Sequence, residues 1–169
     1  MRLAGPALAL LLASCGGAAA EAGRAVRAYD DAVVRAYKLN DPAGLDKVAT
    51  AAEVRRLIAL IDLKLGGRLV LESTLEELKV TKSEAGAEGK TASVETSERW
   101  RYYDRNLAPG KAPGPTFVSA MRMKYDLVRE GGAFKVQQVH TLANEYLEGA
   151  APPRPRGHGA PPDAGAPAP

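Results

Sequence analysis

The side chains best suited to proton transfer lie in the second half of the chain. Glu98 stands in a stretch of alternating residues, in phase with Thr96 and Trp100. Side chains two residues apart share one face of a strand, so this carboxylate is expected to point into the fold. His140 falls in a second such stretch, in phase with Phe134. A carboxylate and an imidazole that met in one pocket could act as general acid and base.

Two tyrosines could complete such a pocket. Tyr102 and Tyr125 fall on the apolar faces of their stretches, where a hydroxyl could donate a hydrogen bond to a ligand. Plainer explanations are favoured. Glu98 could lie at an open rim or on a bulge, and His140 could be structural. The tyrosines could be core residues whose hydroxyls find partners. A catalytic role for these residues is therefore the lesser alternative.

Another stretch favours binding to a partner protein. The segment SERWRYYDR at 97–105 mixes arginine with Trp and Tyr, which are enriched at protein interfaces. Its outward members are expected to be Arg99, Arg101 and Tyr103, although an ordinary solvated strand face is the alternative. No stretch interleaves basic and aromatic residues in the way that suggests nucleic acid.

Composition narrows the chemistry further. The 169 residues include 23 basic and 20 acidic side chains, two histidines and one cysteine. With one cysteine, a disulfide within the chain is excluded. Because only one histidine lies outside the proline-rich end of the chain, we expect no metal site and no cofactor. The length is enough for one domain held by its own core.

The single cysteine follows an export-like start. Arg2 provides a positive charge, and the apolar run 3–13 is too short to span a membrane, which takes about 20 residues. Residues 12–15 (LASC) resemble the bacterial lipoprotein box. That resemblance implies that residues 1–14 are a signal peptide and that Cys15 carries the lipid. Two or more acyl chains make such anchoring stable.

Two other interpretations of this start remain open. Cleavage after the alanines at 18–20 would discard Cys15, and the cysteine could instead be a structural core residue. If the lipoprotein resemblance holds, Gly16 slightly favours the outer over the inner membrane. Residues 15–23, rich in glycine and alanine, are then expected to be a lipidated cysteine and a flexible tether.

Three helices are expected next. Val26, Tyr29, Val33 and Tyr37 recur at helical spacing from Arg24 onward. Asp41 with Pro42 predicts the start of a short second helix. The segment TAAE at 50–53 is a capping box that predicts a third helix, which ends at the glycines at 66–67.

About four long strands should follow. The segments 68–80, 91–103, 116–128 and 133–142 show a period of two and are separated by polar, Pro-Gly or Gly-Gly turns. Such short turns predict an antiparallel meander. The apolar parity of the first strand changes midway, which predicts a bulge near Leu75–Glu77, or else a break into two strands.

This order of elements predicts an α+β domain over residues 24–148, with three helices packed on a curved antiparallel sheet. It resembles the nuclear-transport-factor-2-like superfamily, a cone of helices over a bent sheet. Within it, LDKVATAAEV, GRLVLESTLEELKV, ASVETSERWRYYD and YDLVREGGAFKVQQV look most similar to the intermembrane-space domain of plastid and cyanobacterial division proteins. The resemblance implies a scaffold shared by pocket enzymes and non-catalytic binding domains.

The remaining segment, 149–169, is mostly Pro, Ala and Gly and is expected to be disordered. Taken together, the sequence predicts an envelope lipoprotein with a non-catalytic binding or scaffolding domain. Its expected partners are the membrane and an envelope protein or peptide, and no nucleic acid. The alternative is a small isomerase or dehydratase that uses Glu98 and His140.

Overall fold

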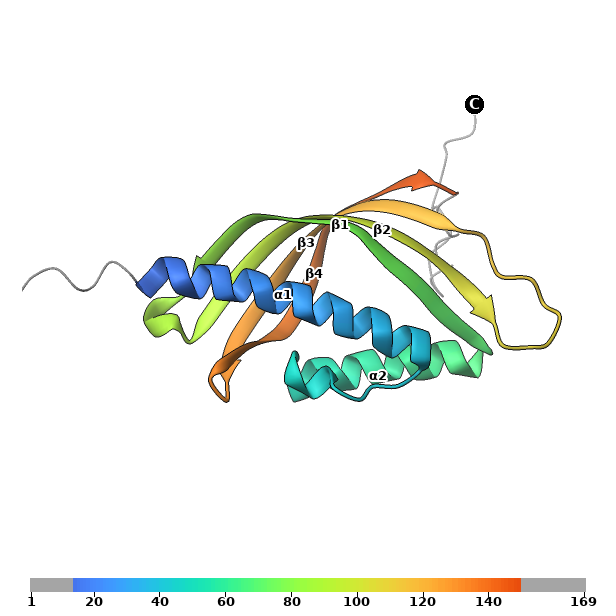
Figure 1. Cartoon of the computed structure of the whole chain (residues 1–169), viewed down its shortest axis with the longest axis horizontal. Coiled ribbons are helices and arrows are strands. Elements are labelled where there is room, and N and C mark those ends of the chain that lie inside the picture. The colour runs from blue at the N-terminus through green and yellow to red at the C-terminus, as the bar shows by residue number, and fades with distance from the viewer. Residues whose placement is uncertain (1–13, 150–169) are drawn as a thin grey trace, which may run out of the picture.

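Two α-helices lie under the concave face of a bent sheet in the computed structural model, which describes residues 14–149 (Figure 1). Helix α1 spans Ser14–Leu39 and helix α2 spans Ala51–Gly66. The antiparallel sheet has the order β1-β2-β3-β4, which is a meander. Its strands are β1 (Leu69–Ala85), β2 (Thr91–Asn106), β3 (Phe117–Glu130) and β4 (Ala133–Glu148). The α+β class and the antiparallel sheet agree with the prediction.

The prediction of three helices is wrong. Where the second helix was expected, there is a single 3₁₀ turn, η1, at Leu45–Lys47. Gly44 before it has φ 88°, a left-handed conformation that interrupts a helix. Directly after it, Ala49 forms a parallel bridge with Val136 of β4, and Thr50 N donates to Val136 O at 2.9 Å. The backbone here is committed to the sheet, so the helix cannot continue.

Helix α1 begins ten residues earlier than expected. The segment 15–23, predicted to be a flexible tether, is helical, and Ala22 is fully buried. Ser83 Oγ of β1 donates to Ala19 O at 2.8 Å, so this part of the helix is attached to the sheet. The folded domain therefore extends to within a few residues of Cys15.

The register of β1 confirms the predicted bulge. Its pairing with β2 shifts between Leu75 and Glu77, and again between Val80 and Lys82, while the strand stays continuous. Bulges bend and twist a strand, which suits the curvature that Figure 1 shows. Half of the predicted capping box is present: the Thr50 side chain accepts a hydrogen bond from Glu53 N, whereas Thr50 N donates to Val136 O and not to the Glu53 side chain.

The core lies between the helices and the concave face of the sheet. Val26 and Leu57 from the helices and Val94, Leu127 and Val136 from the strands are all buried there. None of the described helices is long and apolar enough to cross a membrane. The predicted signal peptide, apart from its last residue, and the tail beyond residue 149 lie outside the described residues.

Candidate ligand-binding cavity

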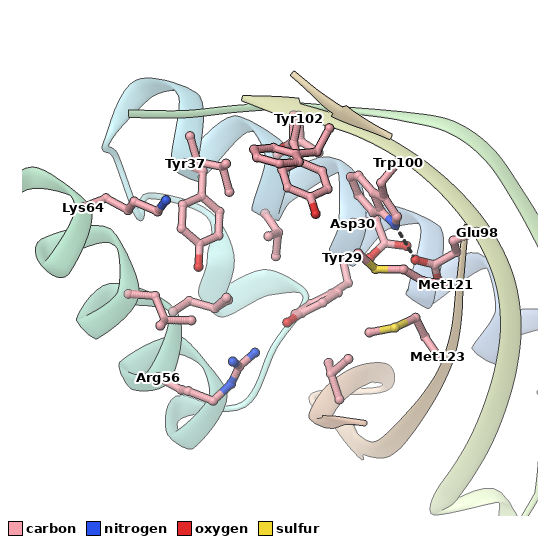
Figure 2. Close-up of a pocket in the computed structure, with 18 of the residues that line it drawn as sticks. Tyr29, Asp30, Tyr37, Arg56, Lys64, Glu98, Trp100, Tyr102, Met121 and Met123 are labelled. Carbon is pink, nitrogen blue, oxygen red and sulfur yellow. Dashed lines mark hydrogen bonds between the residues drawn. The ribbon is translucent and has the colours of Figure 1, made fainter. Parts of the chain in front are cut away.

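A cavity of about 480 Å³ lies between the helices and the sheet. Its walls come from both helices and all four strands, and aromatic and aliphatic side chains predominate (Figure 2). The volume falls within the range of small-molecule sites. Three carboxyl groups, those of Asp30, Glu98 and Asp104, line the cavity, and the side chains of Asp30 and Glu98 are almost completely buried.

Glu98 points into the fold, as the alternation of β2 indicated, and is 2% exposed. Thr96 Oγ1 donates to its Oε1 at 2.5 Å, and Trp100 Nε1 donates to Oε2 at 2.6 Å. The Tyr125 hydroxyl lies 2.8 Å from Oε1. Three donors therefore hold this carboxylate in place, which is the coordination expected for a buried anion.

Asp30 reaches the same place from α1. Its Oδ1 lies 3.2 Å from the Tyr125 hydroxyl, and its buried Oδ2 has no hydrogen-bond partner among the described residues. Burial, followed by the nearby charge of Glu98, raises the pKa of Asp30 to about 8. At neutral pH Asp30 is therefore mostly protonated. It can donate to the Tyr125 oxygen while Tyr125 donates to Glu98.

Tyr125 is the link between the two acids. Its ring is 2% exposed and meets Tyr29 edge to face, with centroids 6.1 Å apart. Burial, followed by the charges of Asp30 and Glu98, raises the pKa of Tyr125 well above its usual range. The phenol thus stays protonated and serves as a hydrogen-bonding bridge.

The opposite side of the cavity carries two cations from α2, Arg56 and Lys64 (Figure 2). Each of these cations forms an ion pair with a different carboxylate. Arg56 donates to buried Glu53 through Nε at 2.7 Å and through a second nitrogen, and Tyr29 also donates to that carboxylate. Lys64 Nζ lies 2.7 Å from Asp104 Oδ1. Neither cation contacts the Asp30–Glu98 pair.

Tyr102 also lines the cavity, so the structure brings three of the four candidate catalytic residues to one place. Its hydroxyl lies 3.2 Å from Ser119 Oγ, and its ring stacks on Phe117 at 5.7 Å. Burial is the main cause that raises the pKa of Tyr102. Tyr102 therefore forms part of the aromatic wall and does not contact the acid pair.

His140 does not line the cavity. It lies opposite Lys124 in the β3–β4 ladder, and its Nε2 is 2.9 Å from Asp126 Oδ2. The reason is a bulge in β4, where the register shifts between Asp126 and Leu127 of the partner strand. One extra residue exchanges the faces of the side chains that follow it. Glu98 and His140 are thus not brought together.

The proposed interface residues divide between two places. Arg99 and Arg101 both bind Glu76 of β1, with Nε–Oε distances of 2.8 and 2.6 Å. This outer group also includes Glu148, 3.8 Å from Arg101. Tyr103, expected to face outward with the arginines, contributes to the cavity wall.

Cys15 lies in the first turn of α1. Within residues 14–149 no cluster of side chains suits a metal ion.

Asp30 is the site residue that sequence reasoning missed. It lies four residues after Val26 and four before Val34, on the buried stripe of α1, and this spacing was the signal that could have found it. Glu53 was assigned only to its capping box. Its pairing with Arg56 is an i,i+3 contact within α2, a local pattern that could have been found, whereas its contact with Tyr29 depends on packing between the two helices.

Comparison with solved structures finds a match to the crystal structure of the intermembrane-space region of the chloroplast protein ARC6. The TM-score is 0.66 with 19% sequence identity, and the match covers 74% of this chain and 96% of the other. At this identity the likeness shows a shared fold. No family model matches the chain, and no curated protein matches it either. The expected resemblance to such an intermembrane-space domain is therefore supported in fold. The lipoprotein box and the wider nuclear-transport-factor-2-like superfamily stay predictions.

Proposed function

We propose that this chain is an envelope lipoprotein whose domain binds a small, mainly apolar ligand without transforming it. The observation that carries this proposal is the cavity of about 480 Å³, which is lined mainly by aromatic and aliphatic side chains. A pocket of this size and lining, with a few polar groups in fixed positions, is the usual form of a small-molecule site. The fold shared with an intermembrane-space region is compatible with a domain that works beside a membrane.

The arrangement of the polar groups favours binding over catalysis. Glu98 is held by three donors, so its lone pairs are engaged. His140 is paired with Asp126 away from the cavity. The acid–base pair that the enzyme alternative required is therefore not assembled.

One observation keeps an isomerase or dehydratase as a second candidate. Asp30 lines the cavity, and its raised pKa of about 8 suits a group that exchanges protons near neutral pH. Deuterium uptake from heavy water into a carbonyl compound bound in the cavity, abolished in Asp30→Asn, would favour this candidate.

The start of α1 bears on the membrane anchor. If Cys15 carries the lipid, only a few residues separate it from Ala19, whose carbonyl oxygen accepts a hydrogen bond from Ser83 of β1. Tyr29, the first cavity residue of α1, is 14 positions after Cys15, or about 21 Å along a helix at 1.5 Å per residue. We therefore propose that the domain is held close to the bilayer with its cavity beginning about 21 Å from Cys15 along α1, the outer membrane being slightly favoured.

Anchoring is tested by Cys15→Ser in the full chain. We expect the variant to lose the lipid mass and to leave the membrane fraction. An unchanged mass and unchanged partitioning would overturn the anchor. Ser14→Ala, which keeps the cysteine, is the matched control.

Cavity binding is tested through the fluorescence of Trp100, the single tryptophan, which lines the cavity. Titration with the neutral probe 2-phenylethanol should change its emission in a saturable way. Val33→Phe, which fills space in the cavity wall, should weaken that binding, whereas Arg55→Ala on the exposed side of α2 should not. Absence of saturable binding would contradict the proposed function.

A further inference from the structure

The acid side of the cavity lacks a compensating positive charge. Asp30 and Glu98 approach one another through the single hydroxyl of Tyr125. Arg56 and Lys64, across the cavity, are engaged by Glu53 and Asp104. Figure 2 shows these two cations on the α2 side and both carboxyl groups at the opposite end of the cavity, Asp30 from α1 and Glu98 from β2. Buried carboxylates are normally paired with a cation or several donors, and here only Glu98 has its donors.

The hydrogen-bond acceptor without a donor is an oxygen of Asp30. This side chain is 4% exposed, lines the cavity, and has one buried oxygen, Oδ2, without a hydrogen-bond partner in the described part of the chain. A buried acceptor left without a donor costs about 1–3 kcal/mol. A ligand that brings a donor to this oxygen recovers that cost.

Aromatic rings contribute to the same cavity wall. Tyr29, Trp100 and Tyr125 line the cavity together with Asp30, and Figure 2 shows Trp100 at the Glu98 end while the Tyr29 ring extends toward Arg56. The faces of such rings attract cations, and the attraction is greatest where water is excluded. An acid with an unfilled acceptor, set among aromatic rings, is the chemistry that recognises an ammonium group.

We propose that the cavity binds an organic cation, an amine whose ammonium group lies against Asp30 and whose apolar body fills the aromatic part of the cavity. This inference rests on the proposed function, because it names the ligand class of the same cavity. A carboxylate ligand is disfavoured at this end by Glu98, and an uncharged ligand would bring no positive charge to stabilise the ionised form of Asp30.

The protonation of Asp30 in the free protein gives this assignment a measurable consequence. The groups that act on it are Glu98 and Asp31, which favour its neutral form, and Tyr125 and Arg27, which favour its charged form. Burial outweighs them and raises its pKa to about 8. An ammonium group at Oδ2 would reverse that balance, so binding at neutral pH should release a proton from Asp30.

The test compares three ligands of matched shape on the full chain: 2-phenylethylammonium, 2-phenylethanol and phenylacetate. We expect the amine to bind at least about tenfold more tightly than the alcohol, and phenylacetate to bind most weakly, as measured by Trp100 fluorescence and calorimetry. In Asp30→Asn the preference for the amine should disappear while binding of the alcohol persists. Asp126→Asn, a matched change outside the cavity, should keep the preference.

The other outcomes separate this inference from the proposed function. If the alcohol or phenylacetate binds as tightly as the amine, the cation assignment is overturned and cavity binding stands. Persistence of the amine preference in Asp30→Asn would overturn the role of Asp30. If none of the three ligands binds, both the inference and the proposed cavity function are wrong. The selectivity of the unmodified protein decides the point even if Asp30→Asn does not fold.

Discussion

Glu21 of α1 and Arg129 of β3 form a two-bonded ion pair, with N–O distances of 2.9 and 2.7 Å. The same guanidinium lies 4.2 Å from the centroid of the Phe134 ring and donates to Gly89 O and Gly132 O. One arginine thus joins the N-terminal part of α1 to two turns of the sheet. This contact explains why the segment expected to be a tether is part of the domain.

Arg129→Ala should release the first turns of α1. Glu21 would lose its partner, and the helix before Ala22 would be held mainly by the Ser83–Ala19 contact. We expect faster amide hydrogen exchange over residues 17–24, measured by mass spectrometry, with little change in α2. Arg101→Ala, which breaks an ion pair on the outer face, is the control. Equal exchange rates in the two variants would contradict the role of the Glu21–Arg129 ion pair in holding the start of α1.

The sequence predicted the sheet better than the helices. Alternation identified all four strands, and the change of parity in β1 located its bulge, because a strand's pattern is local. The helix at 42–48 was wrong because Gly44 and the bridge between Ala49 and Val136 override a local capping signal. That bridge joins positions far apart in the chain and leaves no trace in the nearby sequence.

The site could be predicted in part for the same reason. Glu98 faces inward because β2 keeps its alternation from Ala92 onward. His140 was assigned by the same rule to the wrong face, because the bulge of β4 lies between it and Phe134. Asp30 was readable from its helical spacing, but its meeting with Tyr125 depends on how α1 crosses the sheet.

Arg56→Ala should destabilise the domain through Glu53. Glu53 is 3% exposed, and its carboxylate would keep only the Tyr29 hydroxyl as a hydrogen-bond partner. Removing the partner of a buried charge costs about 3–5 kcal/mol, and because half of the Arg56 side chain is exposed we expect a smaller loss, about 2 kcal/mol. Urea denaturation measures it. Arg55→Ala should change the stability little, and equal stability of both variants would contradict the role of the pair.

Tyr125→Phe should destabilise the fold and bring the two acids into direct conflict. Glu98 would lose one of three donors, and Asp30 would lose its hydrogen bond with the Tyr125 hydroxyl. Loss of a buried hydrogen-bonding partner costs about 1–3 kcal/mol, which chemical denaturation at pH 7 can measure. Tyr103→Phe is the control, because the Tyr103 hydroxyl makes no hydrogen bond within residues 14–149. A loss no greater than that of the control would show that the bridge is not structural.

Asp30 should make the stability of the domain depend on pH. Its pKa is about 8 in the folded protein and near the ordinary 3.8 in the unfolded chain, so between these values the folded state holds one more proton. The stabilisation associated with Asp30 is therefore complete below about pH 4 and is lost as the pH rises toward 8. The slope for one proton is about 1.4 kcal/mol per pH unit. Urea denaturation of the unmodified chain and of Asp30→Asn from pH 4 to pH 9 measures it. As the pH rises, the unfolding free energy of the unmodified chain should fall relative to that of Asp30→Asn, and this relative loss should level off above pH 8. Parallel stability curves would show that Asp30 titrates alike in both states.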